Sequence, residues 1–277
     1  MRPDRPAVVR ILSSAALAAV LALSVAGCQT TGDDITGSIG ATGTPRVPQT
    51  DAQWRDYAKV WGARYDANPG DADAAMAYAR ALRATGQRAQ AVAVLRQSSM
   101  RNPNNRPLLG AYGRALADAG DYQDALNALD KAHTPDNPNW RILNAQGAVL
   151  DQMGRHQEAQ RYYSSALKME PNEPSVLSNL GLSYALEKHL KLAERTLRKA
   201  AEQPGAQPKV RQNLALIVGL EGRFAEAEKI ARADLPPAQA EANVAYLREM
   251  LARQNELTKR GRRHGGSPSF ASRHGES

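Results

Sequence analysis

A period of 34 residues runs through the middle of the chain and constrains its fold more than any other feature. Five consecutive rows of 34 residues align without an insertion or a deletion. The eighth position of a row holds only alanine or glycine, and the twentieth holds alanine in all five rows. A constant period with small residues at fixed phases indicates a repeat whose units pack on their neighbours. The repeats are 72–105, 106–139, 140–173, 174–207 and 208–240.

Each row predicts two antiparallel helices of about four turns. A glycine stands at the fifteenth position of four rows, where Lys188 is the exception, and prolines mark the row ends. Glycine and proline interrupt helices, so they separate the two helices of a row and one row from the next. The small residues at positions 8 and 20 let the paired backbones approach closely, while larger residues fill the space between hairpins. Unrelated amphipathic helices that share alanine by composition are the alternative, and the constant period argues against them.

The repeat resembles the tetratricopeptide repeat over 72–238. The clearest rows read LNAQGAVLDQMGRHQEAQRYYSSALKMEPN at 143–172 and LSNLGLSYALEKHLKLAERTLRKAAEQP at 177–204. The resemblance implies an all-α fold, a right-handed superhelix of about five helical hairpins. It also implies a scaffold for protein interactions rather than an enzyme, in which the first helix of each hairpin lines a concave groove.

Both ends of the repeat array read as capping helices. The segment 51–67 places Trp54, Tyr57, Trp61 and Tyr65 on one face at helical spacing, a stripe that is more often packing than a ligand cage. The segment 238–258 carries apolar residues at a similar spacing. The predicted repeat domain therefore spans 51–258.

The amino terminus has the pattern of a lipoprotein signal. Residues 1–10 carry a net charge of +2, and residues 11–27 carry no charge. A basic start, an apolar middle and small residues before a boundary are typical of a secretory signal peptide. The residues Val-Ala-Gly-Cys at this boundary resemble the bacterial lipobox, which implies cleavage after residue 27 and lipidation of Cys28, the only cysteine of the chain. An ordinary signal peptide with an accidental cysteine is the alternative.

Two further segments are too polar to fold on their own. Residues 28–50 are rich in glycine and threonine and are predicted to form a flexible tether. Residues 259–277 carry a net charge of +4 and are predicted to be a disordered basic tail. The signal and the tail account for most of the total charge of +8, so the folded part is not basic and nucleic-acid binding is not expected.

The sequence contains no pattern typical of a catalytic site. None of the five histidines stands at metal-ligand spacing from another histidine, a cysteine or a carboxylate on one helix. The sequence also lacks a glycine-rich phosphate loop and a nucleophile elbow. We therefore expect no catalytic residue, no metal and no cofactor.

The resemblance implies that row positions 2, 5, 6, 9, 12 and 13 line the groove, so its residues can be assigned from their positions in the rows. It is expected to be cationic in its first two repeats and apolar in its last two, with amides along it that suit an extended peptide backbone. The arginines are alternatively only solvated, and the leucines are alternatively covered by the capping helix 238–258. The set of basic residues that makes the family's carboxylate clamp is missing. The candidates are Arg80, Arg83, Arg114, Asn144, Asn179, Asn213, Leu182 and Leu216.

The order of segments carries one more resemblance. A lipobox, a tether reading QTTG…TGSIG and about five repeats resemble the TadD lipoproteins of alphaproteobacterial Flp/Tad pilus systems. The resemblance implies an outer-membrane lipoprotein facing the periplasm, held by its lipid anchor, that assists a secretin or another pilus assembly component as a pilotin. A general envelope adaptor for peptidoglycan enzymes or for outer-membrane protein assembly is the alternative.

Overall fold

The computed structural model describes residues 48 and 50–264, and this part of the chain is helical. One isolated β-bridge joins Thr134 to Asn137. The described residues contain no β-strand beyond this single bridge. The described helices are α2 (Asp51–Ala67), α3 (Ala72–Ala84), α4 (Arg88–Arg101), α5 (Arg106–Ala119), α6 (Tyr122–Asp130), α7 (Trp140–Gln152), α8 (His156–Met169), α9 (Pro174–Leu186), α10 (Leu190–Ala201), α11 (Pro208–Leu220), α12 (Phe224–Ala231) and α13 (Pro237–His264).

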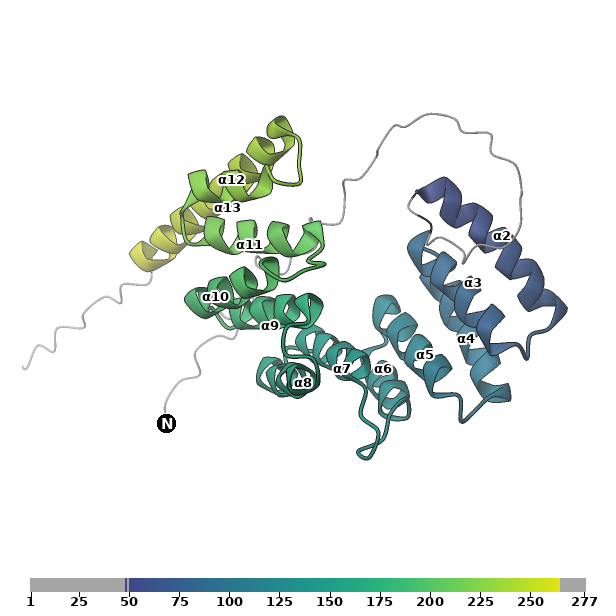
Figure 1. Ribbon diagram of the computed structural model, residues 1–277. Helices are drawn as coiled ribbons and strands as arrows, with labels where there is room; N and C mark the ends of the chain where they lie inside the picture. The colour runs from purple at the N-terminus through teal and green to yellow at the C-terminus, as the bar shows by residue number, and fades with distance from the viewer. Residues whose placement is uncertain (1–47, 49, 265–277) are drawn as a thin grey trace, which may run out of the picture.

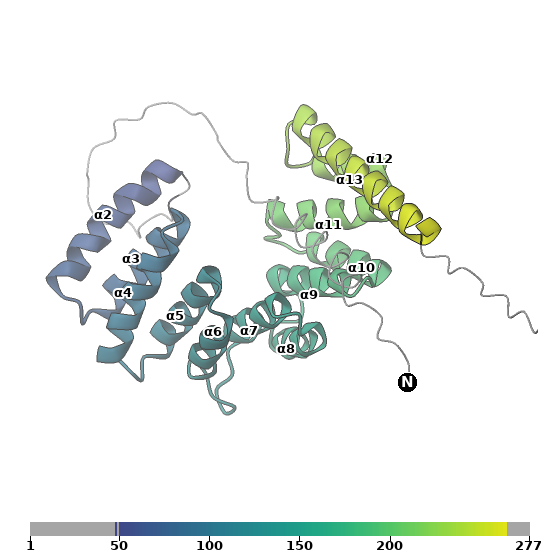
Figure 2. The same cartoon turned by 180° about the vertical axis from the view of Figure 1, so that it is seen from behind.

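The helices from α3 to α12 form five antiparallel hairpins that follow the 34-residue period. The first helix of each hairpin begins at the first residue of its row. Figures 1 and 2 show the hairpins stacked side by side into a curved array, with α2 at one end and α13 at the other. Each first helix also contacts the first helix of the next hairpin, so these five helices share one side of the array. The predicted all-α superhelix of five hairpins is confirmed.

Local sequence explains where the first helices begin. Asp71 accepts hydrogen bonds from the backbone N–H groups of Asp73 and Ala74, and Asn105 accepts one from Leu108. Side-chain oxygens at this position satisfy N–H groups that have no partner inside the helix. Two other first helices, α9 and α11, begin with proline, which tolerates the first helical position because its missing N–H is not needed there.

The turn inside each hairpin requires a left-handed backbone. Glycine occupies it in four hairpins with φ between 75° and 93°, and Lys188 occupies it in the fourth hairpin with φ 67°. A side chain at positive φ brings its Cβ close to the following carbonyl oxygen, which costs about 1–2 kcal/mol. Lys188 therefore holds the same turn geometry as the glycines, at a cost in backbone strain.

The small residues of the period lie where paired helices touch. All five alanines at position 20 are fully buried, namely Ala91, Ala125, Ala159, Ala193 and Ala227. At position 8, a Cβ built on Gly113 would lie 2.6 Å from Leu129 and 3.1 Å from the backbone oxygen of Ala125. Gly181 has the equivalent contacts with Leu197 and Ala193. The small residues at positions 8 and 20 of each row therefore mark where the two helices of a hairpin lie closest together.

Two of the second helices are shorter than the predicted four turns. The helix α6 has nine residues and α12 has eight. Proline follows each of them, at Pro135 and Pro138 after α6 and at Pro236 and Pro237 after α12. Proline lacks the N–H that a helical hydrogen bond needs and restricts the residue before it, so neither helix could extend through these prolines, although both already end before them, at Asp130 and Ala231.

The flanking helices pack on the ends of the array. Tyr65 of α2 is buried and donates a hydrogen bond to Gln97 of α4 over 2.8 Å. At the other end Leu247 of α13 lies against Gly219 of α11, and Val244 is buried in the same cluster as parts of α11 and α12. The helix α13 begins at Pro237 and ends at His264. Residues 259–264 therefore belong to α13, and the prediction of disorder for them is wrong, since the helix continues through Gly261.

A network of charged side chains joins α10 to the turn before α12. Glu194 is 8% exposed and accepts hydrogen bonds from Arg198 over 2.7 Å and from Arg223 over 2.8 Å. Burial acts to raise the pKa of Glu194, but the hydrogen bonds from both arginines outweigh it and lower the pKa to about 2. The carboxylate is therefore charged at neutral pH and links the fourth hairpin to the fifth.

Four predictions concern residues outside the described part, namely the signal peptide 1–27, the lipidation of Cys28, most of the tether 28–50 and the tail from residue 265. Within the described residues, no helix combines the length and the apolar character that crossing a bilayer requires.

Candidate functional site

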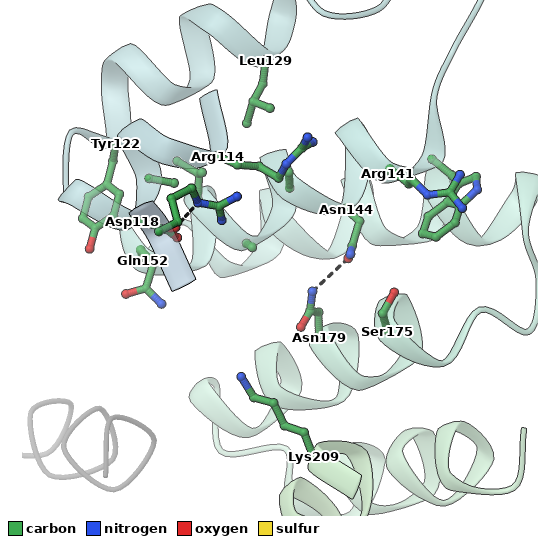
Figure 3. A pocket seen from close by; sticks show the side chains of 16 residues that line it. Arg114, Asp118, Tyr122, Leu129, Arg141, Asn144, Gln152, Ser175, Asn179 and Lys209 are labelled. Carbon is green, nitrogen blue, oxygen red and sulfur yellow. Dashed lines mark hydrogen bonds and ion pairs between the residues drawn. The ribbon is translucent and has the colours of Figure 1, made fainter. Parts of the chain in front are cut away.

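A hollow of about 750 Å³ opens on the side of the array where the first helices lie. We call it the basic hollow. All five first helices contribute to it, together with two residues of α6 (Figure 3). Its lining is Arg83, Arg114, Ala117, Asp118, Tyr122, Leu129, Trp140, Arg141, Asn144, Ala145, Ala148, Val149, Gln152, Ser175, Asn179 and Lys209.

The charged side chains of the basic hollow are mostly positive. Its lining contains three arginines and Lys209, but only one carboxylate, that of Asp118. The Nε of Arg83 donates to Asp118 over 2.5 Å, so this pair largely neutralises itself. The guanidinium of Arg141 lies 4.2 Å from the centre of the Trp140 ring, a cation–π contact that holds it in place and leaves its N–H groups available. The hollow therefore keeps an excess of positive charge.

Arg114 is the least compensated of these cations. It is half-buried on α5, and no hydrogen bond or ion pair holds its guanidinium within the described part of the chain. Burial lowers its pKa, and repulsion from Arg83 adds to this, while Asp118 acts in the opposite direction. A guanidinium that has lost part of its water without gaining a partner gives up hydration energy, which a bound anion would restore.

Two amides form a bridge across the basic hollow. The amide N–H of Asn179 on α9 donates to the side-chain oxygen of Asn144 on α7 over 3.0 Å, and Figure 3 shows the two side chains pointing toward each other. Each amide uses one group in this bond. The amide NH2 of Asn144 remains available as a donor group and the side-chain oxygen of Asn179 as an acceptor, and a peptide backbone can match both.

The structure separates the eight predicted groove residues. Arg83, Arg114, Asn144 and Asn179 line the basic hollow. Arg80 lies outside its lining, on the ring of Trp54 in α2, with its guanidinium 5.5 Å from the ring centre. The ninth position of the first row, a predicted groove position, therefore contacts the flanking helix α2.

The other three lie elsewhere. Asn213 is 5% exposed and donates to the hydroxyl of Ser178 over 3.0 Å. This bond joins the sixth position of one row to the fifth of the row before, as the bond between Asn179 and Asn144 does, so it is a repeated contact between first helices. Leu182 and Leu216 are half-buried and do not line the basic hollow.

Sequence reasoning missed Arg141, Ser175 and Lys209. All three stand at the second position of their rows, which the resemblance already assigns to the concave side. At the ninth and twelfth positions arginine occurs only in the first two rows, so the prediction placed the cationic character there. The structure adds cations from the third and fifth repeats.

A polar cluster beside the basic hollow joins the third and fourth hairpins. Asp151 accepts hydrogen bonds from the hydroxyls of Tyr163 and Ser183 and lies 2.9 Å from the Nδ1 of His156. Burial raises the pKa of Asp151, and the hydrogen bonds from these three groups oppose it. Ser183 donates to the carboxylate and makes no hydrogen bond to His156 in the described part, so the cluster lacks the pairing that activates a nucleophile.

The arrangement offers recognition chemistry. No group of three or more histidine, cysteine, aspartate or glutamate side chains within the described residues could hold a metal ion. What the basic hollow provides is an unpartnered guanidinium, a stacked guanidinium, a lysine and a pair of amides on one curved surface.

Comparison with known proteins identifies the repeat. The family model described as anaphase-promoting complex, cyclosome, subunit 3 matches residues 55–132, and a tetratricopeptide repeat model matches residues 144–208. No curated protein sequence matches the chain.

PilW and the Cut9–Hcn1 tetramer share the fold of this chain. PilW, a widely conserved type IV pilus biogenesis factor, is 18% identical over 66% of this chain and 86% of its own, with a TM-score of 0.57. The Cut9–Hcn1 tetramer of the anaphase-promoting complex is 16% identical over 73% of this chain and 40% of its own, with a TM-score of 0.60. MamA is 26% identical over 55% of this chain and 89% of its own, with a TM-score of 0.45.

Proposed function

From the tetratricopeptide-type repeats that this chain carries in both halves, we propose that it is an envelope scaffold that binds another protein on the concave side of the array. In the proposed setting it is an outer-membrane lipoprotein facing the periplasm and a component of Flp/Tad pilus assembly. Its role there is pilotin-like, assisting a secretin or another assembly component.

The single observation that supports protein binding is the basic hollow. All five first helices place polar groups on one curved face, and among them the half-buried Arg114 has no hydrogen-bond partner within the described part of the chain. Surface groups that serve only folding are normally paired or solvated, whereas the guanidinium of Arg114 is partly withdrawn from water and left without a partner. A protein segment laid across several hairpins would satisfy the polar groups of this face together.

The envelope location and the pilus role rest on the amino-terminal sequence. The lipobox with Cys28 and the tether support anchoring by acyl chains, and two or more such chains make membrane attachment stable. PilW is a type IV pilus biogenesis factor, and its similarity to this chain establishes a shared fold. The assignment to Flp/Tad pili therefore depends on the resemblance in segment order.

Cross-linking in intact cells tests the proposal. A tagged full chain is cross-linked in the envelope, and the captured proteins are compared with those of a Cys28→Ser variant that lacks the lipidation site. Capture of a secretin or a pilus assembly component by the wild type, reduced in the variant, supports the pilus role. Unchanged membrane attachment and unchanged pilus formation in the variant would remove the anchoring argument.

The same experiment separates the alternative. Capture of peptidoglycan enzymes or of outer-membrane assembly components, without any pilus component, would replace the pilus role by that of a general envelope adaptor. Capture of no protein from the concave side would refute the scaffold function itself.

A further inference from the structure

The strongest feature that the proposed function leaves unexplained is the sign and spacing of charge in the basic hollow. The hollow carries four cations and one carboxylate although the folded part of the chain is nearly balanced. Only Arg83 has a carboxylate partner within the hollow. The other three, Arg114, Arg141 and Lys209, come from α5, α7 and α11.

The three cations without a carboxylate partner lie along the array rather than at one point. They belong to the second, third and fifth hairpins, so a compact anion cannot contact all of them. Packed helices lie about 8–10 Å apart, and three such steps separate α5 from α11, roughly 25–30 Å. An extended polypeptide rises about 3.3 Å per residue, so about eight or nine residues cover this length.

The amide bridge lies between these cations. Asn144 and Asn179 belong to α7 and α9, and both line the basic hollow between Arg114 on one side and Lys209 on the other (Figure 3). Together they present a donor and an acceptor. A chain of phosphates offers only acceptors to this pair, whereas a peptide backbone offers both a donor and an acceptor at every residue.

We propose that the basic hollow binds an extended acidic segment of about eight or nine residues in the partner protein, with one carboxylate on Arg114 and others on Arg141 and Lys209. The Asn144–Asn179 bridge holds the backbone of this segment between the carboxylates. The inference rests on the proposed function, since it names the chemistry of the partner that the scaffold binds.

Arg114 is the anchor of this interaction because it has no competing partner. A carboxylate can receive two parallel hydrogen bonds from one guanidinium, a geometry that lysine cannot reproduce. Arg83, already bonded to Asp118, contributes less. The segment is recognised along its length, so a free carboxyl terminus is not required.

Fluorescence anisotropy with the full chain tests the proposal. The probe is a labelled pool of nine-residue peptides with glutamate at every second position and random residues between, and its control is the same pool with glutamine. The glutamate pool should bind at least about tenfold more tightly than the glutamine pool, and Arg114→Gln should remove about tenfold of its affinity. Arg80→Gln makes the same charge change outside the basic hollow and should alter affinity by less than about twofold.

Other outcomes overturn the proposal. Equal binding of both pools, no binding of the glutamate pool, or an unchanged affinity in Arg114→Gln would each refute an acidic ligand at this site. Arg114→Lys keeps the charge and should retain only part of the affinity, and full retention would refute the bidentate anchor. A single-stranded oligonucleotide that displaces the glutamate pool and loses affinity equally in Arg114→Gln would show a general anion site.

The folding of the variants and the proposed function are checked separately. Arg114→Gln should melt at the temperature of the wild type, because Arg114 makes no hydrogen bond within the described part of the chain. If cross-linking captures a partner on the concave side while neither pool binds, the acidic specificity is wrong and the scaffold function stands. If nothing is captured, the scaffold function fails first.

Discussion

Replacing Gly147 with alanine tests the packing on which the whole array depends. A Cβ built on Gly147 would lie 2.6 Å from the Tyr163 ring, well inside the distance that real contacts allow. The ring has no room to move, because Tyr163 is 1% exposed and its hydroxyl donates to Asp151 over 2.9 Å. The added methyl group must therefore push the two helices of the third hairpin apart or break the bond to Asp151.

The cost can be worked out from these contacts. Forcing extra volume into a packed core costs about 1–3 kcal/mol, and losing a hydrogen bond to a charged acceptor costs about 1.5–3 kcal/mol. Alanine returns about 1 kcal/mol because it favours the helix over glycine. If the methyl group does both, the net loss of unfolding free energy is about 1.5–5 kcal/mol, which lowers the melting temperature by roughly 3–20 °C for a domain of this size.

Thermal unfolding by circular dichroism measures the total, and hydrogen exchange in α7 and α8 shows whether the loss is local to the third hairpin. The same substitution in a Tyr163→Ala background is the matched control. The ring that the new methyl group would meet is absent in this background, so the alanine should cost less than about 1 kcal/mol there. Equal costs in the two backgrounds, or a Gly147→Ala variant as stable as the wild type, would refute the close approach.

Three more results are expected. Lys188→Gly should stabilise the protein by about 0.5–1 kcal/mol in thermal unfolding, because glycine adopts the positive φ of this turn without strain, and Lys188→Ala should not. In acid titration, the stability supplied by the hydrogen bonds from Arg198 and Arg223 to Glu194 should be complete above 4.5, the usual pKa of a glutamate. It should be lost as the pH falls toward about 2, the pKa of Glu194 in the folded protein. Glu194→Gln should flatten this loss, and an unchanged acid profile in that variant would contradict the network. Asn213→Ala should cost about 1–3 kcal/mol in urea unfolding by leaving a buried hydroxyl without its partner, and a neutral result would show that the bond contributes nothing.

The repeat was accessible to sequence reasoning because it is a property of periodicity. Close contact between paired helices requires small side chains at the same position in every unit. Ala159 and its equivalents meet this requirement in the sequence, and the structure buries all of them. The first residue of each row is the first residue of a helix for a related reason: capping residues and prolines act on their immediate neighbours. Such local rules do not need the rest of the molecule.

Helix ends set by longer context were predicted less well. The sequence pattern predicted about four turns for α6 and α12, but these helices end after nine and eight residues. It also ended α13 at residue 258, where the loss of apolar periodicity suggested disorder, whereas the structure continues the helix to His264. A helix can extend beyond the last residue that packs on a neighbour. The pattern of apolar residues shows only the part that packs, so it did not predict the last turns of α13.

The sequence by itself determined the all-α repeat, its register and the residues that bring paired helices together, because each depends on spacing along the chain. Only the tertiary structure decided which polar side chains remain open. Arg80 and Arg114 occupy the same position in their rows, yet Arg80 lies on the Trp54 ring and Arg114 faces the basic hollow without a partner. Asn179 and Asn213 likewise share a position, and only Asn179 lines the hollow. Whether a charge or an amide finds a partner depends on residues from other hairpins, whose distance in space is fixed by stacking and is not encoded at the position itself.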